Sequence, residues 1–408
     1  MKKIEKYEEI FVPGSPIRDK RYLFGRKQEF SDLQNILRRP GQHAIIIGYR
    51  GVGKTSLVKQ VLKETNYLSC WRTCDPDSSF SEVFQDLLKN CGIDFNKTQT
   101  LEETVKEGIT KVAPLQIGLE GKISRRCQET KEYFTKEELK PWRVYKHLES
   151  IKEKVVLVLD EYDALHYATF DFESPFHKSV AYTMKHLSDH SDICNSRLVI
   201  VGVANSAKEL LGKHESIERS AREIYLRTLR HEDFFDFLDE AEKDLEIKFD
   251  SEVKYHLAYG SLGFPYYLHL VGLECIDSML ARDKKARIVT QVDLEIAKKK
   301  AVEKAFRSEL RKYESVLYKL SRPEKICIKE LALYPKISPP RQEICRYICK
   351  NNGISEAECY AAFLNLQQKH KFIYILRRTD EIRFVDPLMK PFLRDKVTIQ
   401  TNEQAKLF

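Results

Sequence analysis

Apolar and polar positions along the 408-residue chain follow one pattern in the first half and another in the second. In the first half, short runs of consecutive apolar residues alternate with stretches in which apolar residues recur at helical spacing. The runs are HAIIIG (43–48), VVLVLD (155–160) and RLVIVGVAN (197–205), and we predict a further strand over YLSCWRTC (67–74). Strands that are apolar on both faces are typical of a parallel sheet with helices on both sides. We therefore predict an α/β fold, with a helix over 27–38 before the first strand.

The second half lacks such runs. From about Arg230 to Phe306 the pattern is wholly helical, and from about Ser308 helices lead into a hairpin, FIYIL–RRTDE–IRFVD. Two helices followed by a hairpin are typical of a winged helix. Residues 96–150 are charged and weakly periodic, and we interpret them as a mostly helical insertion. The predicted domains are a core (1–229, including that insertion), a helical lid (230–307) and a winged helix (308–408).

The first apolar run leads directly into GYRGVGKT, a full match to GxxxxGK[ST]. Glycines let the backbone curl so that its N–H groups point at phosphate, and the following helix adds its dipole. We expect Lys54 to reach the β- and γ-phosphates and the Thr55 hydroxyl to ligate Mg²⁺. A strand before the loop and a helix after it favour this interpretation over a chance match. The candidate nucleotide-binding residues are Gly48, Tyr49, Arg50, Gly51, Val52, Gly53, Lys54, Thr55 and Ser56.

The second candidate feature is an acidic pair, Asp160 and Glu161, at the end of the run VVLVLD. A strand-end Asp is the expected Mg²⁺ partner of a phosphate loop. The adjacent Glu161 can orient and deprotonate the attacking water, which favours hydrolysis over binding alone. The alternative is an ordinary solvated acidic turn. We interpret Asp163 as a helix cap or an outer charge.

Polar residues also follow the run RLVIVGVAN. Asn205 is expected at the carboxyl end of its strand, where ligands of parallel sheets bind, and its amide can hold the attacking water or the γ-phosphate. The alternative is a turn-forming Asn. Farther on, Arg219 or Arg222 is a candidate arginine finger, acting on a neighbouring subunit or on its own site. The alternative for both arginines is a surface helix with ordinary charges.

These motifs, in this order and spacing, resemble the AAA+ ATPases and the STAND-type switch ATPases over about residues 20–395. DEYDAL and GVAN resemble the archaeal-type replication initiators. GFPYYLHLVG (263–272) and FVDPLMKPFLR (384–394) are more similar to the archaeal-type ATPases and STAND proteins, which carry a Gly-x-Pro in the helical domain and end in a winged helix. The resemblance implies a P-loop ATPase that uses ATP, ADP and Mg²⁺.

The same resemblance implies roles for two further segments. In YLFGR, it places Phe24, Gly25 and Arg26 near the adenine, whereas the alternative is a hydrophobic staple ahead of a helix. In the second segment, the Gly-x-Pro ending at Pro265 can press the helical domain onto the base or phosphates. The alternative there is a plain helix start, since proline fits the first turn. A sensor arginine near residue 266 is typical of the initiators, but this stretch offers tyrosines and a histidine instead.

Net charge is +8, and residues 310–397 alone hold 18 Lys and Arg against 10 Asp and Glu. This basic C-terminal block permits a duplex DNA partner, with Arg377 and Arg378 expected at the wing tip. Against that, the second helix of the predicted winged helix begins with Glu356 and Glu358, which resembles a helix that packs on protein.

Ten cysteines lack zinc-site spacing, so we expect free thiols in a reducing cytoplasm. The sequence contains neither a secretory signal pattern nor an apolar run of about 20 residues, so we expect no membrane partner.

Together these features favour an ATP-dependent switch that couples nucleotide state to conformational change or oligomerisation, in regulation or defence signalling. Its partners would be ATP and either a second copy of the chain or another protein. The alternative is a DNA-binding initiator or loader that uses the winged helix on duplex DNA. A third possibility, a scaffold that holds nucleotide without turnover, is disfavoured by Glu161.

Overall fold

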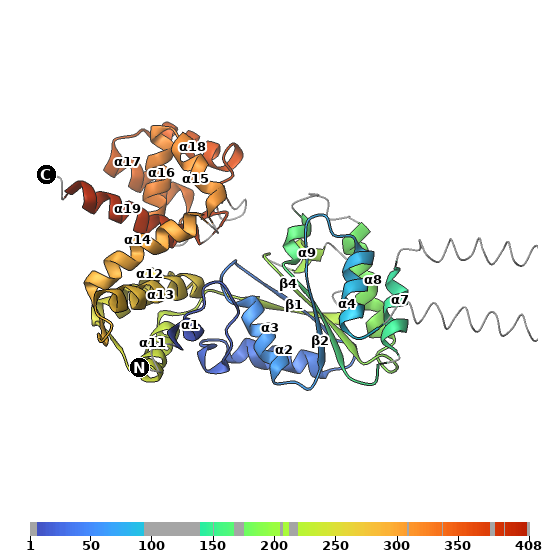
Figure 1. Ribbon diagram of the computed structural model, residues 1–408. Coiled ribbons are helices and arrows are strands. Elements are labelled where there is room, and N and C mark those ends of the chain that lie inside the picture. The colour runs from blue at the N-terminus through green and yellow to red at the C-terminus, as the bar shows by residue number, and fades with distance from the viewer. Residues whose placement is uncertain are drawn as a thin grey trace, which may run out of the picture. The chain divides into compact units, whose positions relative to one another are not determined.

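The computed structural model describes residues 6–93, 139–149, 151–166, 175–204, 207–211, 219–307, 310–336, 338–375, 380–386 and 388–405 (Figure 1). The chain divides into two compact units. The first unit comprises Met1–Lys27, Gly48–Gln60 and Leu226–Phe408, and the second comprises Gln28–Ile47 and Val61–Tyr225. The three domain boundaries expected from the sequence stay predictions, and most of the 96–150 insertion lies outside the described residues.

A five-stranded sheet forms the second unit. Its order is β2 (Leu68–Thr73), β3 (Val155–Asp160), β4 (Ser196–Gly202), β1 (His43–Gly48) and β5 (Ala221–Leu226). Neighbouring strands from β2 to β1 are parallel, as the apolar runs predicted. The sequence did not predict β5, because AREIYL mixes buried and more exposed positions instead of forming an apolar run. An edge strand needs burial at only part of its positions.

Side chains of alternate strand residues pack on opposite faces of this sheet. Ile45, Leu157 and Ile200 belong to a core with three helices, α4 (Phe80–Asn90), α7 (Pro141–Leu148) and α8 (Pro175–Asp189). These helices lie together on one side of the sheet, and α2 (Lys27–Arg38) lies on the other (Figure 1). Ile46 and Val156 are also fully buried, although they face away from that core. Burial on both faces explains why each central strand is apolar throughout.

One pair of cysteines departs from the expectation of free thiols. Cys70 of β2 and Cys91, which follows α4, form a disulfide, and their Cα atoms lie 6.0 Å apart. This spacing results from the packing of α4 against β2, which brings together residues 21 positions apart. The expectation of free thiols is therefore wrong for this pair, while the other cysteines in the described residues are free.

Helices dominate the first unit. Before its C-terminal region they include α1 (Tyr7–Ile10), α11 (His231–Leu245), α12 (Ser251–Gly260), α13 (Pro265–Arg282) and α14 (Gln291–Arg307). The helical pattern predicted over 230–306 is confirmed, except for a short parallel pair, β6 (Lys248–Phe249) and β7 (Ile288–Val289). Phe11 packs into this helical region. Its ring lies edge-on to Phe237 with the ring centroids 5.3 Å apart, and it lies so close to Gly272 that a Cβ there would clash.

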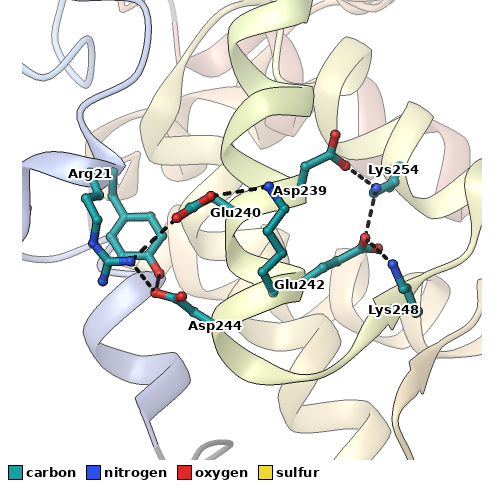
Figure 2. A network of polar contacts seen from close by, with 9 residues as sticks. Arg21, Asp239, Glu240, Glu242, Asp244, Lys248 and Lys254 are labelled. Carbon is teal, nitrogen blue, oxygen red and sulfur yellow. Dashed lines mark hydrogen bonds and ion pairs between the residues drawn. The ribbon is translucent and has the colours of Figure 1, made fainter.

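Ion pairs fasten the segment before the FGR motif to α11 (Figure 2). This segment forms a short helix, η2 (Lys20–Tyr22). Arg21 contacts Asp244 at 3.0 Å and Glu240 at 3.5 Å, and the Tyr22 hydroxyl donates to Asp244 at 2.5 Å. Because the Arg21 side chain is 55% exposed, its ion pairs fix the path of the chain more than they stabilise it.

The C-terminal region, residues 310–405, begins with four helices, continues through a hairpin and ends in a long helix. The elements are α15 (Arg311–Lys319), α16 (Arg322–Leu333), α17 (Arg341–Asn352), α18 (Glu356–Gln368), β8 (Ile373–Ile375), β9 (Ile382–Phe384) and α19 (Met389–Ala405). β8 and β9 pair antiparallel, which confirms the predicted hairpin. Assignment of this region as a winged helix stays a prediction. No helix in the described part of the chain is both long and apolar enough to cross a membrane.

Candidate nucleotide-binding site

The GxxxxGKT motif has the strand–loop–helix context that phosphate binding requires. β1 ends at Gly48, and α3 (Lys54–Lys63) begins at Lys54. Three glycines of the loop have positive φ, at +147° for Gly48, +75° for Gly51 and +94° for Gly53. A Cβ at Gly48 would lie 2.4 Å from a backbone oxygen, so only glycine fits there. The loop therefore curls as the motif predicts.

Lys54 is buried inside this curl. Its Nζ donates to the carbonyl oxygens of Gly48 and Tyr49, at 3.0 and 2.8 Å. These bonds hold the ammonium group beside the N-terminus of α3, where backbone N–H groups favour an anion. Thr55 is half-buried in the first turn of the helix. The Ser56 hydroxyl accepts a hydrogen bond from the backbone of Ile17 at 3.2 Å, which anchors the N-terminal segment to the loop.

The FGR segment reaches the same loop. Arg26 is buried, and its Nη2 donates to the carbonyl oxygens of Val52 and Arg227, at 2.9 and 2.7 Å. Gly25 has φ +65°, and a Cβ there would lie 2.7 Å from Asp233. The ring of Phe24 packs edge-on against a phenylalanine of α11. These contacts tie the segment to the phosphate loop, while its proximity to adenine stays a prediction.

The Gly-x-Pro turn also meets the loop. Pro265 occupies the first turn of α13, and the backbone N–H of Tyr266 approaches the carbonyl oxygen of Gly51 at 3.4 Å. A Cβ at Gly51 would lie 3.1 Å from the Tyr266 Cβ and equally close to Leu388 of the C-terminal region. The opening turn of α13 and the C-terminal region therefore both pack against the phosphate loop.

The acidic pair lies in the second unit, at the carboxyl edge of the sheet. The register of β3, β4 and β1 places Asp160 at the edge where all three strands end. Asp160 is nearly buried, and its Oδ1 accepts from the backbone N–H of Glu161 at 3.0 Å. Glu161 is exposed with φ +51°, a strained conformation for a residue with a side chain and one that clusters at functional sites. Asp163 accepts from the backbone of Val203 at 2.8 Å, so it fixes the end of β4.

The remaining candidate residues are either exposed or outside the described residues. Arg219 is exposed, and Arg222 is exposed on β5 rather than on the surface helix considered as an alternative. Asn205, Arg377 and Arg378 lie outside the described residues. Sequence reasoning missed Arg383 of β9, whose Nη1 donates to the Tyr49 hydroxyl at 2.7 Å. No local pattern marks this residue, since the two partners are 334 positions apart.

Residues 23–271 match a family described as an ATPase domain predominantly from Archaea. The chain belongs to this archaeal-type ATPase family. The match spans the FGR segment, the phosphate loop, the acidic pair and the Gly-x-Pro turn. The protein is accordingly a P-loop ATPase that binds and hydrolyses ATP, as the motifs predicted.

Solved structures support the fold of this archaeal-type ATPase. A Walker-type ATPase of Pyrococcus abyssi is 18% identical with a TM-score of 0.54, over 94% of this chain and 99% of that one. The ORC2 protein of Aeropyrum pernix, in ADPNP–ADP complexes, is 13% identical with a TM-score of 0.51, over 97% of this chain and 98% of that one. At these identities the likeness concerns the fold alone. Comparison with curated proteins gives no match.

Proposed function

We propose that this ATPase is a nucleotide-driven switch, in which ATP and ADP favour different arrangements of the helical and C-terminal regions. One observation supports the proposal most strongly: the phosphate loop touches both regions within the first unit. Gly51 packs against Tyr266 and Leu388, and Tyr49 accepts a hydrogen bond from Arg383. A ligand shifts a conformational equilibrium only through different contacts with the two states, and these contacts offer a place for that difference.

The donor set of the motifs suits a magnesium nucleotide. Mg²⁺ prefers hard oxygen ligands, and the Thr55 hydroxyl and Asp160 carboxylate are of that kind. When bound, the ion would neutralise charge on the β- and γ-phosphates. In this scheme Lys54 binds the same phosphates, and the N–H groups of the loop and of the first turn of α3 surround them.

Hydrolysis then depends on residues beyond the loop. Glu161 orients the attacking water and takes its proton, and Asn205 holds that water in place. Arg219 or Arg222 contacts the γ-phosphate, either of a neighbouring subunit or of its own site. The resulting cycle would act in regulation or defence signalling, through self-association or a protein partner. Loss of the γ-phosphate resets the switch.

A second candidate function is a DNA-binding initiator or loader. It is favoured by the C-terminal excess of basic residues and by Arg377 and Arg378 between the strands of the hairpin. The first turn of α18 argues against DNA binding. Ser355 caps this helix, and the Glu358 carboxylate accepts from the Ser355 backbone at 2.9 Å, which places acidic charge where a recognition helix would meet bases.

The test is steady-state ATP turnover at low salt, with and without duplex DNA. If the protein is a switch, ATP turnover is the same with and without DNA. Glu161→Gln then lowers ATP turnover about 100-fold or more, which is the usual contribution of a general base. Glu153→Gln is the matched control, because Glu153 is also exposed but precedes β3 instead of following it. Strong stimulation by DNA, lost in a variant with Arg377→Glu and Arg378→Glu, would favour the loader instead. Wild-type turnover in Glu161→Gln would remove that residue from the mechanism.

A further inference from the structure

The first turns of helix α13 place no lysine or arginine beside the phosphate loop. Its first residues, Pro265 and Tyr266, lie against Gly51, yet residues 260–272 include neither lysine nor arginine. The ring of Tyr49 adds an apolar contact here, since its centroid lies 6.4 Å from that of Phe264. Apart from Arg50 and Lys54 in the loop itself, a further positive charge must therefore come from another element.

Arg383 of the C-terminal region provides such a charge within the first unit. Its Nη1 donates to the Tyr49 hydroxyl at 2.7 Å, and its Nη2 pairs with Glu381 at 3.3 Å. Lys54 donates to the carbonyl oxygen of the same tyrosine at 2.8 Å. Tyr49 is thus bound by two cations, one on its backbone and one on its side chain.

The Arg383 guanidinium has a donor to spare. It carries five N–H groups, and its Nε is buried with no hydrogen-bond partner in the part of the chain that the structure describes. A buried donor without an acceptor is costly, and an anionic oxygen is the acceptor that suits guanidinium best. The neighbouring loop has the backbone of a phosphate-binding loop, so a nucleotide phosphate is the anion expected here.

We propose that Arg383 is a phosphate-binding residue of the ATPase site, supplied in cis by β9 in place of a basic residue on α13. The inference rests on the proposed binding of nucleotide at Lys54 and names one more residue that recognises it. We assign Arg383 to the γ-phosphate, which ATP has and ADP lacks, so it favours ATP. Its position on β9 makes the C-terminal region part of the site that distinguishes the two nucleotides.

The experiment measures the dissociation constants of ATP and ADP, with Mg²⁺, in a Glu161→Gln background that slows turnover. Arg383→Met is expected to weaken ATP binding about tenfold or more, as for loss of a hydrogen bond to a charged group. The same variant should weaken ADP binding less. Arg383→Lys should recover part of the loss, since it keeps the charge but not the planar fork. Arg341→Met is the matched control. Arg341 also lies in the C-terminal region, is 24% exposed against 27% for Arg383, and pairs with Asp380 at 2.9 Å.

A Tyr49→Phe variant separates a phosphate contact from a merely structural role. It removes the hydroxyl partner of Arg383 but leaves the guanidinium, so the preference for ATP over ADP should persist. The proposal is overturned if Arg383→Met keeps both affinities, if it weakens ATP and ADP equally, or if Tyr49→Phe reproduces its effect. Lys54→Ala tests the underlying function separately, because unchanged ATP binding in that variant would remove the nucleotide from this loop whatever Arg383 does.

Discussion

Both units of this ATPase have apolar cores, but the contacts of their central elements differ. In the second unit the central strands are aliphatic, and every residue from Val155 to Leu159 is fully buried. In the first unit, polar groups are buried between helices. Tyr267 of α13 donates to Asp395 of α19, and Asp395 also pairs with Lys298 of α14 at 3.1 Å.

This difference bears on which unit can change shape. Apolar packing resists displacement, because any shift opens a cavity in a close-packed core. A hydrogen bond is directional, and a second arrangement keeps its energy where the donor meets another acceptor. The sheet therefore suits a fixed platform, whereas the contacts of α13, β9 and α19 suit two arrangements.

The largest stability effect is expected in the sheet. Leu157→Ala removes a fully buried side chain from the middle of β3 and should lower the free energy of unfolding by about 3 kcal/mol. Urea denaturation followed by tryptophan fluorescence isolates this unit, because Trp71 and Trp142 both belong to it. Ile193→Ala, at an isoleucine of the same unit that is 54% exposed, is the control. Equal effects of the two variants would contradict the assignment of a rigid apolar core.

Acid should weaken the same unit. Burial lowers the pKa of His43 to about 4, and the neutral ring accepts from Leu198 N–H while its other nitrogen contacts Met184 O. The pKa in the unfolded chain is about 6.5, so the stabilisation is complete above that pH and is lost as the pH falls from about 6.5 to about 4. A shift of this size corresponds to about 3 kcal/mol. Denaturation at pH 7.5 and 4.5, followed by the same fluorescence, should show a larger loss for wild type than for His43→Gln; equal losses would exclude His43 as the cause.

A smaller effect, confined to the first unit, is expected for Tyr267→Phe. It removes the hydroxyl that bonds Asp395 and contacts His256 at 2.9 Å, at a cost of about 1 to 2 kcal/mol. The transition seen by circular dichroism should shift while the tryptophan transition stays in place. Tyr318→Phe, at a tyrosine that is 74% exposed, is the control. A shift in both transitions would mean that the units do not differ as described.

The smallest effect is expected at the exposed ion pairs of Figure 2. Arg21→Ala removes contacts to Asp19, Glu240 and Asp244, but the arginine side chain is 55% exposed. Water and salt screen such pairs, so the melting temperature should not change beyond experimental error. A clear loss that disappears at high salt would show that charge, as well as packing, holds the N-terminal segment on α11.

The parts of the fold that the sequence predicted well depend on local patterns. The helix expected over 27–38 is α2, and the strands expected at HAIIIG and VVLVLD are β1 and β3. An uninterrupted apolar run indicates a buried strand, because a strand covered on both sides must be apolar throughout. The phosphate loop was equally predictable, since its glycines and lysine are consecutive in sequence.

Features formed by distant residues escaped prediction. The disulfide of Cys70 and Cys91 depends on how α4 packs on β2, and the contact between Tyr49 and Arg383 depends on the fold of the entire first unit. Arg383 looked like any other arginine of a basic hairpin. The sequence offered only an indirect indication of its role, namely the lack of a basic residue near Pro265. That lack does not identify the residue that supplies the charge instead.

Hydrogen exchange in the Glu161→Gln variant, with saturating ATP or ADP, tests the central claim most directly. If the loop couples nucleotide state to the C-terminal region, the amides of β9 and α19 will be protected to different extents by the two nucleotides. Lys54→Ala in the same background should abolish that difference. Identical protection of β9 and α19 with ATP and ADP, with changes confined to residues 48–60, would contradict the switch.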